Sequence, residues 1–438
     1  MTSFQFQLRT QREQEPSAEP VILLDWFGGR AGTVQVRDSL RYALPIPDVA
    51  MDLFRVAGAV YCADRVARRP GTWTRSMELT VPVRDQQLWG SAIDRLSEGI
   101  SFLSGDHWRF EVRSSTEPPW APEETSPPVD AVCLFSAGLD SFTGALDLLA
   151  QGKNICLVGH YEGGQAPKAQ VDLFGKLGHR YSDQHLILRH IFLRPAPRDP
   201  LQLRPLPVRR ETSTRSRSLL FLAAGLAVAA GYGPDVPLYI PENGFIGINV
   251  PLTPARYGSF STRTTHPYFV ATFAEAVQRL GITNPIVNPF RTMTKGEILA
   301  GCRDQGTLQE LAGSTLSCSH PEVARYARRK QGNCGYCFPC LIRRAAMHHI
   351  GLDRAEDYAY DALREDAEMA NKKGNDLRAL IRSLNQPARP IDVLRNGALP
   401  AADIPAFAGV YERGRREILT WMTAATSSQD LRRQLPAT

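Results

Sequence analysis

Residues 131–141 read AVCLFSAGLDS, and this stretch decides the fold. Its first half is apolar and typical of a buried strand, and the small residues after Phe135 are typical of a turn. Asp140 and Ser141 then predict the start of a helix. A strand, a small-residue loop and a helix N-terminus together form an anion site, because backbone N–H groups point outward and the helix dipole favours negative charge.

A second pattern lies far downstream and consists of four cysteines. Cys334, Cys337 and Cys340 follow one another at intervals of three residues, and Cys318 precedes them. Four thiols at these spacings predict a tetrahedral metal site, for which zinc is favoured and an iron–sulfur cluster is the alternative. The other four cysteines lack such partners and are predicted to be small core residues: Cys62, Cys133, Cys156 and Cys302.

The composition is that of a soluble globular protein of two or three domains. The chain has 438 residues, of which 43% are hydrophobic and 22% charged, and a net charge of +6. The longest apolar run, residues 219–230, is too short to cross a bilayer, and the N-terminus has no secretory pattern. We therefore expect a cytoplasmic protein without a membrane partner. Two basic blocks are predicted to be solvated faces rather than a nucleic-acid site: Arg65, Arg68 and Arg69, and Arg325, Arg328, Arg329 and Lys330.

The pattern of hydrophobic residues predicts four parts. These are an N-terminal α+β module at 1–115, a proline-rich linker at 116–130, an α/β domain at 131–350 and a helical region at 351–438. In the α/β domain, predicted strands alternate with predicted helices, which favours a Rossmann-like parallel sheet with helices on both faces. Ligands of such sheets bind beyond the carboxyl ends of the strands, where residues 136–141 are expected.

Residues 136–141 also resemble the SGGxDS loop of the ATP pyrophosphatases, the PP-loop family. The resemblance implies that the loop backbone approaches the α-phosphate of ATP and that Asp140 orients Mg2+. Ala137 stands where that family usually has glycine. If this position needs a positive φ, alanine would cost about 1 kcal/mol and would threaten the loop, whereas at negative φ the methyl is harmless. The alternative is an ordinary strand–turn–helix junction with Asp140 and Ser141 as caps.

Taken together, residues 131–350 resemble the 7-cyano-7-deazaguanine synthase family, known as QueC. Four further stretches match its motifs in order: the turn at 160–165, the helix start at 216–222, Thr-Lys-Gly-Glu-Ile at 294–298, and Ser317-Cys318 with the later cysteines. The resemblance implies an adenine nucleotide hydrolase-like fold and ATP-dependent conversion of a 7-carboxy-7-deazaguanine carboxylate into an amide and then a nitrile, with ammonia as the nitrogen donor. The cofactors implied are ATP, Mg2+ and Zn2+.

The resemblance also assigns roles to residues. The catalytic candidates are Asp140, Lys295 and Arg217. The nucleotide-binding candidates are Ser136, Ala137, Gly138, Leu139, Asp140, Ser141, Tyr161 and Gln165. The metal ligands are Cys318, Cys334, Cys337 and Cys340.

The chain is longer than ordinary members of that family at both ends. Its overall layout resembles the QueC-like component of Qat anti-phage defence systems. We therefore predict a ligase that activates a deazapurine carboxylate and transfers it to an amine, with a partner protein of a defence operon as the acceptor. A 7-cyano-7-deazaguanine synthase that uses ammonia is the alternative. The alternatives are a sulfur-transferring or tRNA-modifying PP-loop enzyme, and an inactive scaffold that keeps only zinc and shape.

Overall fold

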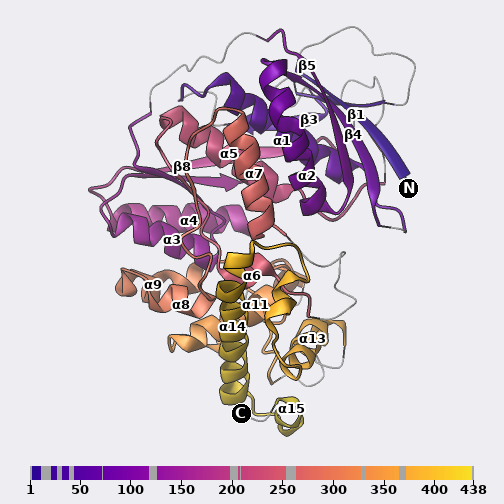
Figure 1. Cartoon of the computed structure of the whole chain (residues 1–438). Helices are drawn as coiled ribbons and strands as arrows, with labels where there is room; N and C mark the ends of the chain where they lie inside the picture. Colours follow the sequence, from indigo (N-terminus) through magenta and orange to yellow (C-terminus); the bar gives the residue numbers. More distant parts are fainter. Residues whose placement is uncertain are drawn as a thin grey trace.

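The structure is a computed structural model, and it describes residues 2–10, 21–26, 32–38, 44–71, 73–117, 126–197, 206–207, 209–252, 263–326, 329, 332–364 and 371–436. Two β-sheets and their helices form the upper part of the molecule in Figure 1, and a mainly helical part lies below them. Residues 118–125 of the predicted linker lie outside the described residues. The flanking residues 115–117 and 126–130 form neither helix nor strand.

The first sheet belongs to the N-terminal part and is parallel throughout. Its strand order is β2-β1-β4-β5. Helices α1 (Asp48–Val66) and α2 (Gln86–Ser104) connect and cover these strands. The strands are β1 (Thr2–Arg9), β2 (Val21–Asp25), β4 (Arg75–Val83) and β5 (His107–Ser114). All six elements lie within residues 1–115, for which the sequence predicts an α+β module.

The second sheet has the order β10-β9-β6-β7-β8-β3. Its first five strands are parallel, and β3 pairs antiparallel with β8 at the edge. The strands are β3 (Val34–Asp38), β6 (Ala131–Leu134), β7 (Ile155–His160), β8 (Leu186–Pro195), β9 (Leu238–Tyr239) and β10 (Ile286–Val287). The predicted parallel sheet is therefore present, whereas the short strands β3 and β10 were not anticipated.

Helices cover both faces of the second sheet. Because successive side chains of a strand point to opposite faces, each strand contributes to two different cores. Val132 and Val158 join the core formed with α1, α5 (Arg217–Tyr232) and α7 (Pro267–Arg279). Cys133 and Leu157 join the opposite core, formed with α3 (Leu139–Leu149) and α4 (Gln165–Arg180). The apolar run at 219–230 is the buried centre of α5.

The N-terminal part shares its core with the second sheet. Strand β3 lies beside β8, helix α1 packs on α5, and helix α2 packs on α7. One continuous hydrophobic cluster accordingly runs from Phe6 in the first sheet to Phe273 in α7. The boundary predicted at residue 115 separates the two sheets in sequence, but β3 crosses from one part to the other.

The lower part of Figure 1 consists of short helices around one long helix, α14 (Ile404–Ala425). This helix packs on α6 (Gly244–Ile248), α8 (Lys295–Ala300) and α11 (Phe338–His349), and Trp421 on it is fully buried. The remaining helices are α9 (Gln305–Leu311), α10 (Val323–Tyr326), α13 (Asn375–Leu384) and α15 (Gln429–Gln434). The C-terminal helices therefore belong to the same packed body as the segments after the second sheet.

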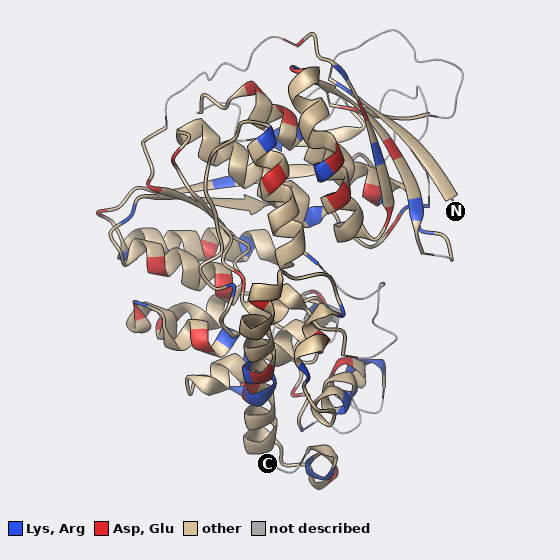
Figure 2. Ribbon diagram, in the orientation of Figure 1, with Lys and Arg blue, Asp and Glu red and all other residues tan. Residues whose placement is uncertain are grey.

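Charges of both signs are interspersed over the helices and strands in Figure 2. This distribution agrees with the mild net charge of the whole chain. Among the described helices, none combines the length and the hydrophobicity that a bilayer crossing requires.

Candidate nucleotide loop and metal centre

The loop at 136–141 joins strand β6 to helix α3, which begins at Leu139 with Gly138 as its N-cap. Serine hydroxyls close the loop on itself. The Ser136 N–H donates to Ser141 Oγ at 3.2 Å, and the Gly138 N–H donates to Ser136 Oγ at 3.2 Å. The two hydroxyl oxygens are 3.1 Å apart. Serine hydroxyl oxygens therefore accept the backbone N–H groups to which a bound anion would otherwise bind.

Ala137 adopts the left-handed conformation, with φ at 60°. The position therefore needs a positive φ, which is the unfavourable case for an alanine and costs about 1 kcal/mol. The loop keeps its closed form because the methyl is small and buried and because the Ala137 carbonyl accepts the Leu316 N–H at 2.8 Å.

Asp140 lies at the centre of a buried polar network. Lys295 Nζ lies 2.5 Å from Asp140 Oδ1, and the Asn243 side-chain amide donates to Asp140 Oδ2 at 2.6 Å. The Asn243 backbone N–H donates to the same oxygen at 3.2 Å. Because both oxygens bind other elements and α3 has no side-chain cap, Asp140 does more than cap its own helix.

Lys295 is the first residue of helix α8, and the N-terminal cap of this helix positions it beside Asp140. Thr294 and Glu297 form a capping box, in which each side chain accepts the backbone N–H of the other residue. Glu417 of α14 accepts the Gly296 N–H at 3.2 Å. A Cβ at Gly296 would lie 2.7 Å from a Glu417 oxygen, so a larger residue here would displace the Glu417 carboxylate from this contact. The C-terminal helix therefore holds the turn that carries Lys295.

The two carboxyl groups of this network, those of Asp140 and Glu242, differ in pKa. Burial opposes the ionisation of Asp140, but the charge of Lys295 and the hydrogen bonds outweigh it and hold the pKa of Asp140 below its usual value. Burial, and then the charge of Asp140, raise the pKa of Glu242 well above its usual value. Two carboxyl groups thus share one lysine, and a second cation would complete the charge balance.

Mg2+ prefers carboxylate oxygens and the oxygens of substrate phosphates. Asp140 and Glu242 are the residues that would hold it, because they are neighbouring carboxyl groups with one excess negative charge when both are ionised. The donor chemistry of these two carboxyl groups fits Mg2+. Mg2+ remains a prediction.

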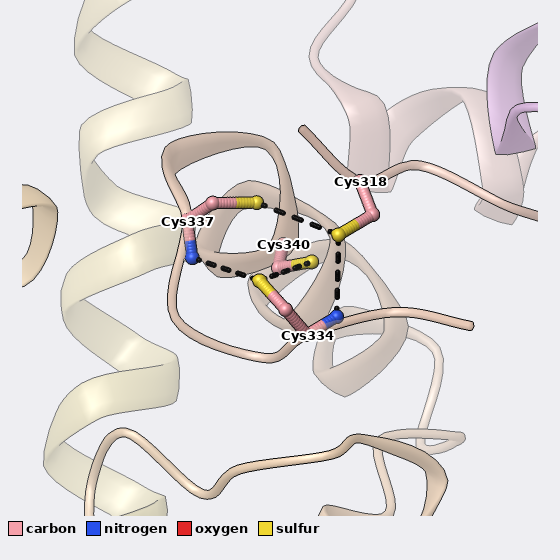
Figure 3. A group of neighbouring side chains, drawn as sticks. All are labelled: Cys318, Cys334, Cys337 and Cys340. Atoms are coloured by element: carbon pink, nitrogen blue, oxygen red, sulfur yellow. Dashed lines mark hydrogen bonds between the residues drawn. The ribbon is translucent and has the colours of Figure 1, made fainter. Parts of the chain in front are cut away.

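The four predicted metal ligands converge in Figure 3. Their sulfur atoms all lie within 4.8 Å of one another, with Cys318 and Cys337 3.9 Å apart and Cys334 and Cys340 3.8 Å apart. Sulfurs bound at about 2.3 Å to one tetrahedral zinc ion are about 3.8 Å apart, whereas disulfide sulfurs are separated by about 2.05 Å. The cluster therefore fits a metal such as zinc.

Backbone amides support the sulfurs. The Cys334 N–H lies 3.2 Å from Cys318 Sγ, and the Cys337 N–H lies 3.4 Å from Cys334 Sγ. N–H donors favour thiolates, which are the form that binds metal. The other cysteines are buried core residues, as predicted.

The metal centre and the loop are directly connected through Ser317, which precedes Cys318. The Leu139 N–H, at the start of α3, donates to Ser317 Oγ at 3.0 Å. The Ser317 N–H donates to Asn333 Oδ1 at 2.9 Å, and Asn333 precedes Cys334. A metal that holds the cysteines together would also hold Ser317 against the loop.

The remaining predicted site residues lie at neighbouring strand ends. Arg217 stacks on Phe221 at 5.0 Å and lowers the pKa of His160, after the larger effect of burial, so it belongs to a cluster beyond β7 rather than to the Asp140 network. Gln165 donates to the Pro321 carbonyl at 3.0 Å and thus touches the cysteine segment. Tyr161 is 40% exposed and stacks on His190.

Three residues of this site were not predicted: Glu242, Asn243 and Ser317. The first two follow strand β9, where polar residues at the carboxyl end of a parallel strand were an available signal. Ser317 was recognised only as the neighbour of a metal ligand. Its contact with Leu139 bridges 178 positions of sequence.

The protein is thus a mixed α/β protein with parallel sheets. A four-cysteine cluster lies beside its strand–loop–helix junction. No protein-family model matches the chain. The chain is 25% identical over 240 residues to 7-cyano-7-deazaguanine synthase from two strains of Leptospira interrogans, of serovars copenhageni and Lai. The match covers 51% of this chain and 88% of each synthase. This distant similarity supports the QueC resemblance, whereas the Qat layout stays a prediction.

Proposed function

We propose that the chain uses ATP to activate the carboxylate of a 7-carboxy-7-deazaguanine-type substrate and transfers the acyl group to an amine. The observation that carries this proposal is the buried network of Asp140, Lys295 and Asn243 at the loop of residues 136–141. The distant similarity to 7-cyano-7-deazaguanine synthase supports the substrate class.

The chemistry follows from the poor electrophilicity of a carboxylate at neutral pH. A substrate oxygen attacks the α-phosphorus of ATP, the bond from that phosphorus to the bridging oxygen breaks, and pyrophosphate leaves with the electron pair. The amine nitrogen then attacks the acyl carbon, AMP leaves, and the amine loses a proton. With ammonia as acceptor, the amide oxygen would attack a second ATP and release pyrophosphate. That oxygen would then leave with AMP while the nitrogen loses its two protons, which gives the nitrile.

The residues of the site have separable roles in this proposal. The amides of Ser136, Gly138 and Leu139, which hydroxyl oxygens now occupy, would bind phosphate oxygens instead. Lys295 would neutralise charge that develops on the α-phosphate. Asp140 and Glu242 would hold Mg2+, which when bound neutralises phosphate charge. The zinc centre would be structural, since its four thiols leave no open position.

A protein amine is the acceptor that we favour, within an anti-phage defence system. The extensions at both ends contain no catalytic motif, and added surface of this kind most simply serves a partner protein docked on residues 1–115. The alternative is an ammonia-using synthase. Sulfur transfer is disfavoured because Cys133 is fully buried in β6, where burial raises the pKa of its thiol and opposes formation of a nucleophilic thiolate.

The test is incubation with ATP, Mg2+ and 7-carboxy-7-deazaguanine, followed by mass spectrometry of small molecules and of candidate partner proteins. We expect AMP and pyrophosphate, together with either an amide or a partner that gains mass. Because residues 1–115 share their core with the second sheet, the docking test uses surface substitutions and not deletion. Arg109→Glu/Glu111→Arg, at exposed positions of β5, should lower partner labelling but leave amide formation with ammonia unchanged. Absence of ATP turnover with any carboxylate would favour the inactive scaffold.

A further inference from the structure

Two adjoining hollows of about 380 and 190 Å3 lie at the carboxyl end of β8. They share Arg210 and Glu211 in their lining, and no residue of the loop at 136–141 lines either of them. Since β8 is parallel to β7 and β6, its carboxyl end lies at the same edge of the sheet as the loop. That edge is where parallel sheets bind ligands. The arginines of the lining are Arg65, Arg68, Arg69, Arg194, Arg209 and Arg210.

Two of these arginines form ion pairs with carboxylates of the protein itself. Arg65 donates to Glu162 and to the Tyr61 hydroxyl, at 3.2 and 2.8 Å. Arg69 makes two bonds of 2.8 Å to Asp106. This pairing corrects the prediction of a solvated face for the first basic block, in which only Arg68 is exposed. Of the second block, Arg328 and Lys330 lie outside the described residues.

The other four arginines of the lining have no carboxylate within ion-pair distance in the described parts of the chain. Arg210 donates to the carbonyls of Ala196, Pro197 and Pro207, which fixes its guanidinium. Burial, followed by repulsion from Arg65, lowers the pKa of Arg210. The positive charge of the hollows therefore exceeds the negative charge that their described lining supplies.

Glu211 is the single carboxylate among the described residues of the lining, and its one negative charge offsets only part of the positive charge. It accepts the backbone N–H groups of Arg69, Thr212 and Ser213, at 2.8 to 3.0 Å. These bonds favour its ionised form and hold its pKa below the usual value, although burial opposes them. Its oxygens are therefore engaged with the backbone that shapes the hollows.

We propose that these hollows form a binding site for a compact polyphosphate group, separate from the nucleotide loop. Guanidinium groups bind phosphate oxygens in pairs, and neighbouring phosphates deliver several negative charges in a volume of a few hundred Å3, whereas a carboxylate delivers one. Among the described residues, the non-arginine lining consists of Pro195, Pro197, Thr212 and Glu211, and none of these offers an aromatic face for a base. Recognition therefore depends on the phosphates and not on a nucleobase.

The experiment measures binding of inorganic tripolyphosphate by calorimetry in EDTA, without Mg2+. The variant Arg68→Glu/Arg209→Glu changes two exposed arginines for which the described residues show no hydrogen bond or ion pair, and Arg382→Glu/Arg433→Glu makes the same charge change on α13 and α15. Both variants are checked for folding by circular dichroism. We expect binding to weaken at least tenfold in the first variant and less than twofold in the control.

Two further arms separate this site from other sources of phosphate binding. Lys295→Met/Asp140→Asn removes the lysine that would meet phosphate at the nucleotide loop, together with its partner carboxylate. This double variant should leave tripolyphosphate binding in EDTA unchanged, and loss of binding there would assign the anion to the nucleotide loop and overturn the proposal. A single-stranded oligonucleotide should be displaced by tripolyphosphate. If the oligonucleotide binds while tripolyphosphate neither binds nor displaces it, or if both double variants bind alike, the proposal is wrong.

Discussion

Replacement of Lys295 by methionine tests the buried network most directly. The Lys295 and Asp140 side chains are 7% and 6% exposed and form a 2.5 Å contact. Methionine preserves most of the side-chain volume but leaves Asp140 without a cation, so that among the described residues it keeps the Asn243 hydrogen bonds and the neighbouring Glu242 carboxyl group. Breaking a buried ion pair from one side costs about 3–5 kcal/mol, because a charge remains unpaired in the interior.

Protonation of Asp140 limits this cost and makes it depend on pH. An aspartate with an unfolded pKa of about 3.9 can be neutralised at pH 7 for about 4 kcal/mol and at pH 5 for about 1.5 kcal/mol. In the variant the pKa of Asp140 is raised in the folded state, so stability falls as pH rises above about 4. We therefore expect Lys295→Met to destabilise the fold by about 3–4 kcal/mol at pH 7 and by about 1.5 kcal/mol at pH 5.

The assay is urea denaturation followed by circular dichroism at both pH values. Asp140→Asn in the Lys295→Met background removes the unpaired charge and should restore about 2 kcal/mol at pH 7. Lys295→Met and Asp140→Asn should each also abolish pyrophosphate release. A loss of stability below about 1 kcal/mol at pH 7, a loss independent of pH, or no rescue by the second substitution would refute the reasoning.

Three further results are expected. The purified chain should contain about one zinc ion, and Cys337→Ala should lower the zinc content and the thermal midpoint together; iron, or no metal in reduced protein, would contradict this. Glu242→Gln should raise the thermal midpoint at pH 8 without Mg2+. The raised pKa of Glu242 in the folded state contributes stability that is present below the unfolded pKa of about 4.3 and is lost as pH rises through the folded pKa. An equal gain in thermal midpoint at pH 4 would exclude titration of Glu242 as the cause. Ala137→Gly should change the free energy of unfolding by less than about 1 kcal/mol, because relief of the backbone strain at φ 60° is offset by loss of a buried methyl group. Ala137→Val should impair pyrophosphate release. Normal turnover by the valine variant would show that this backbone conformation is not required.

Local patterns were sufficient for much of the fold. Hydrophobic alternation and apolar runs located most strands and helices, because one residue in two, or three to four in every seven, must face the core. Strands β9 and β10 are two residues long and β3 is five, so their patterns are barely distinguishable from irregular chain. Only pairing with neighbouring strands identifies β3 and β10.

The cysteine cluster was the most predictable part of the site. Three of its thiols lie within seven residues, so local chain geometry already brings them close together, and Cys318 is the one ligand that folding must supply. The loop at 136–141 was equally visible as a motif, but the conformation of Ala137 was not, since an alanine in sequence does not reveal the sign of its φ.

The sequence by itself determined the alternation that yields a parallel sheet, the loop at its carboxyl edge and the cysteine ligands, because each depends on residues close together in the chain. Only the tertiary structure decided the partners of Asp140. Lys295 is 155 positions away, Asn243 is 103, and Glu417 of the C-terminal helix secures the turn that carries the lysine. The same holds for the arginine-lined hollows, which arise where α1, the end of β8 and residues 209–212 meet. Such contacts come from packing of distant segments, and no local pattern specifies which charges will be buried together.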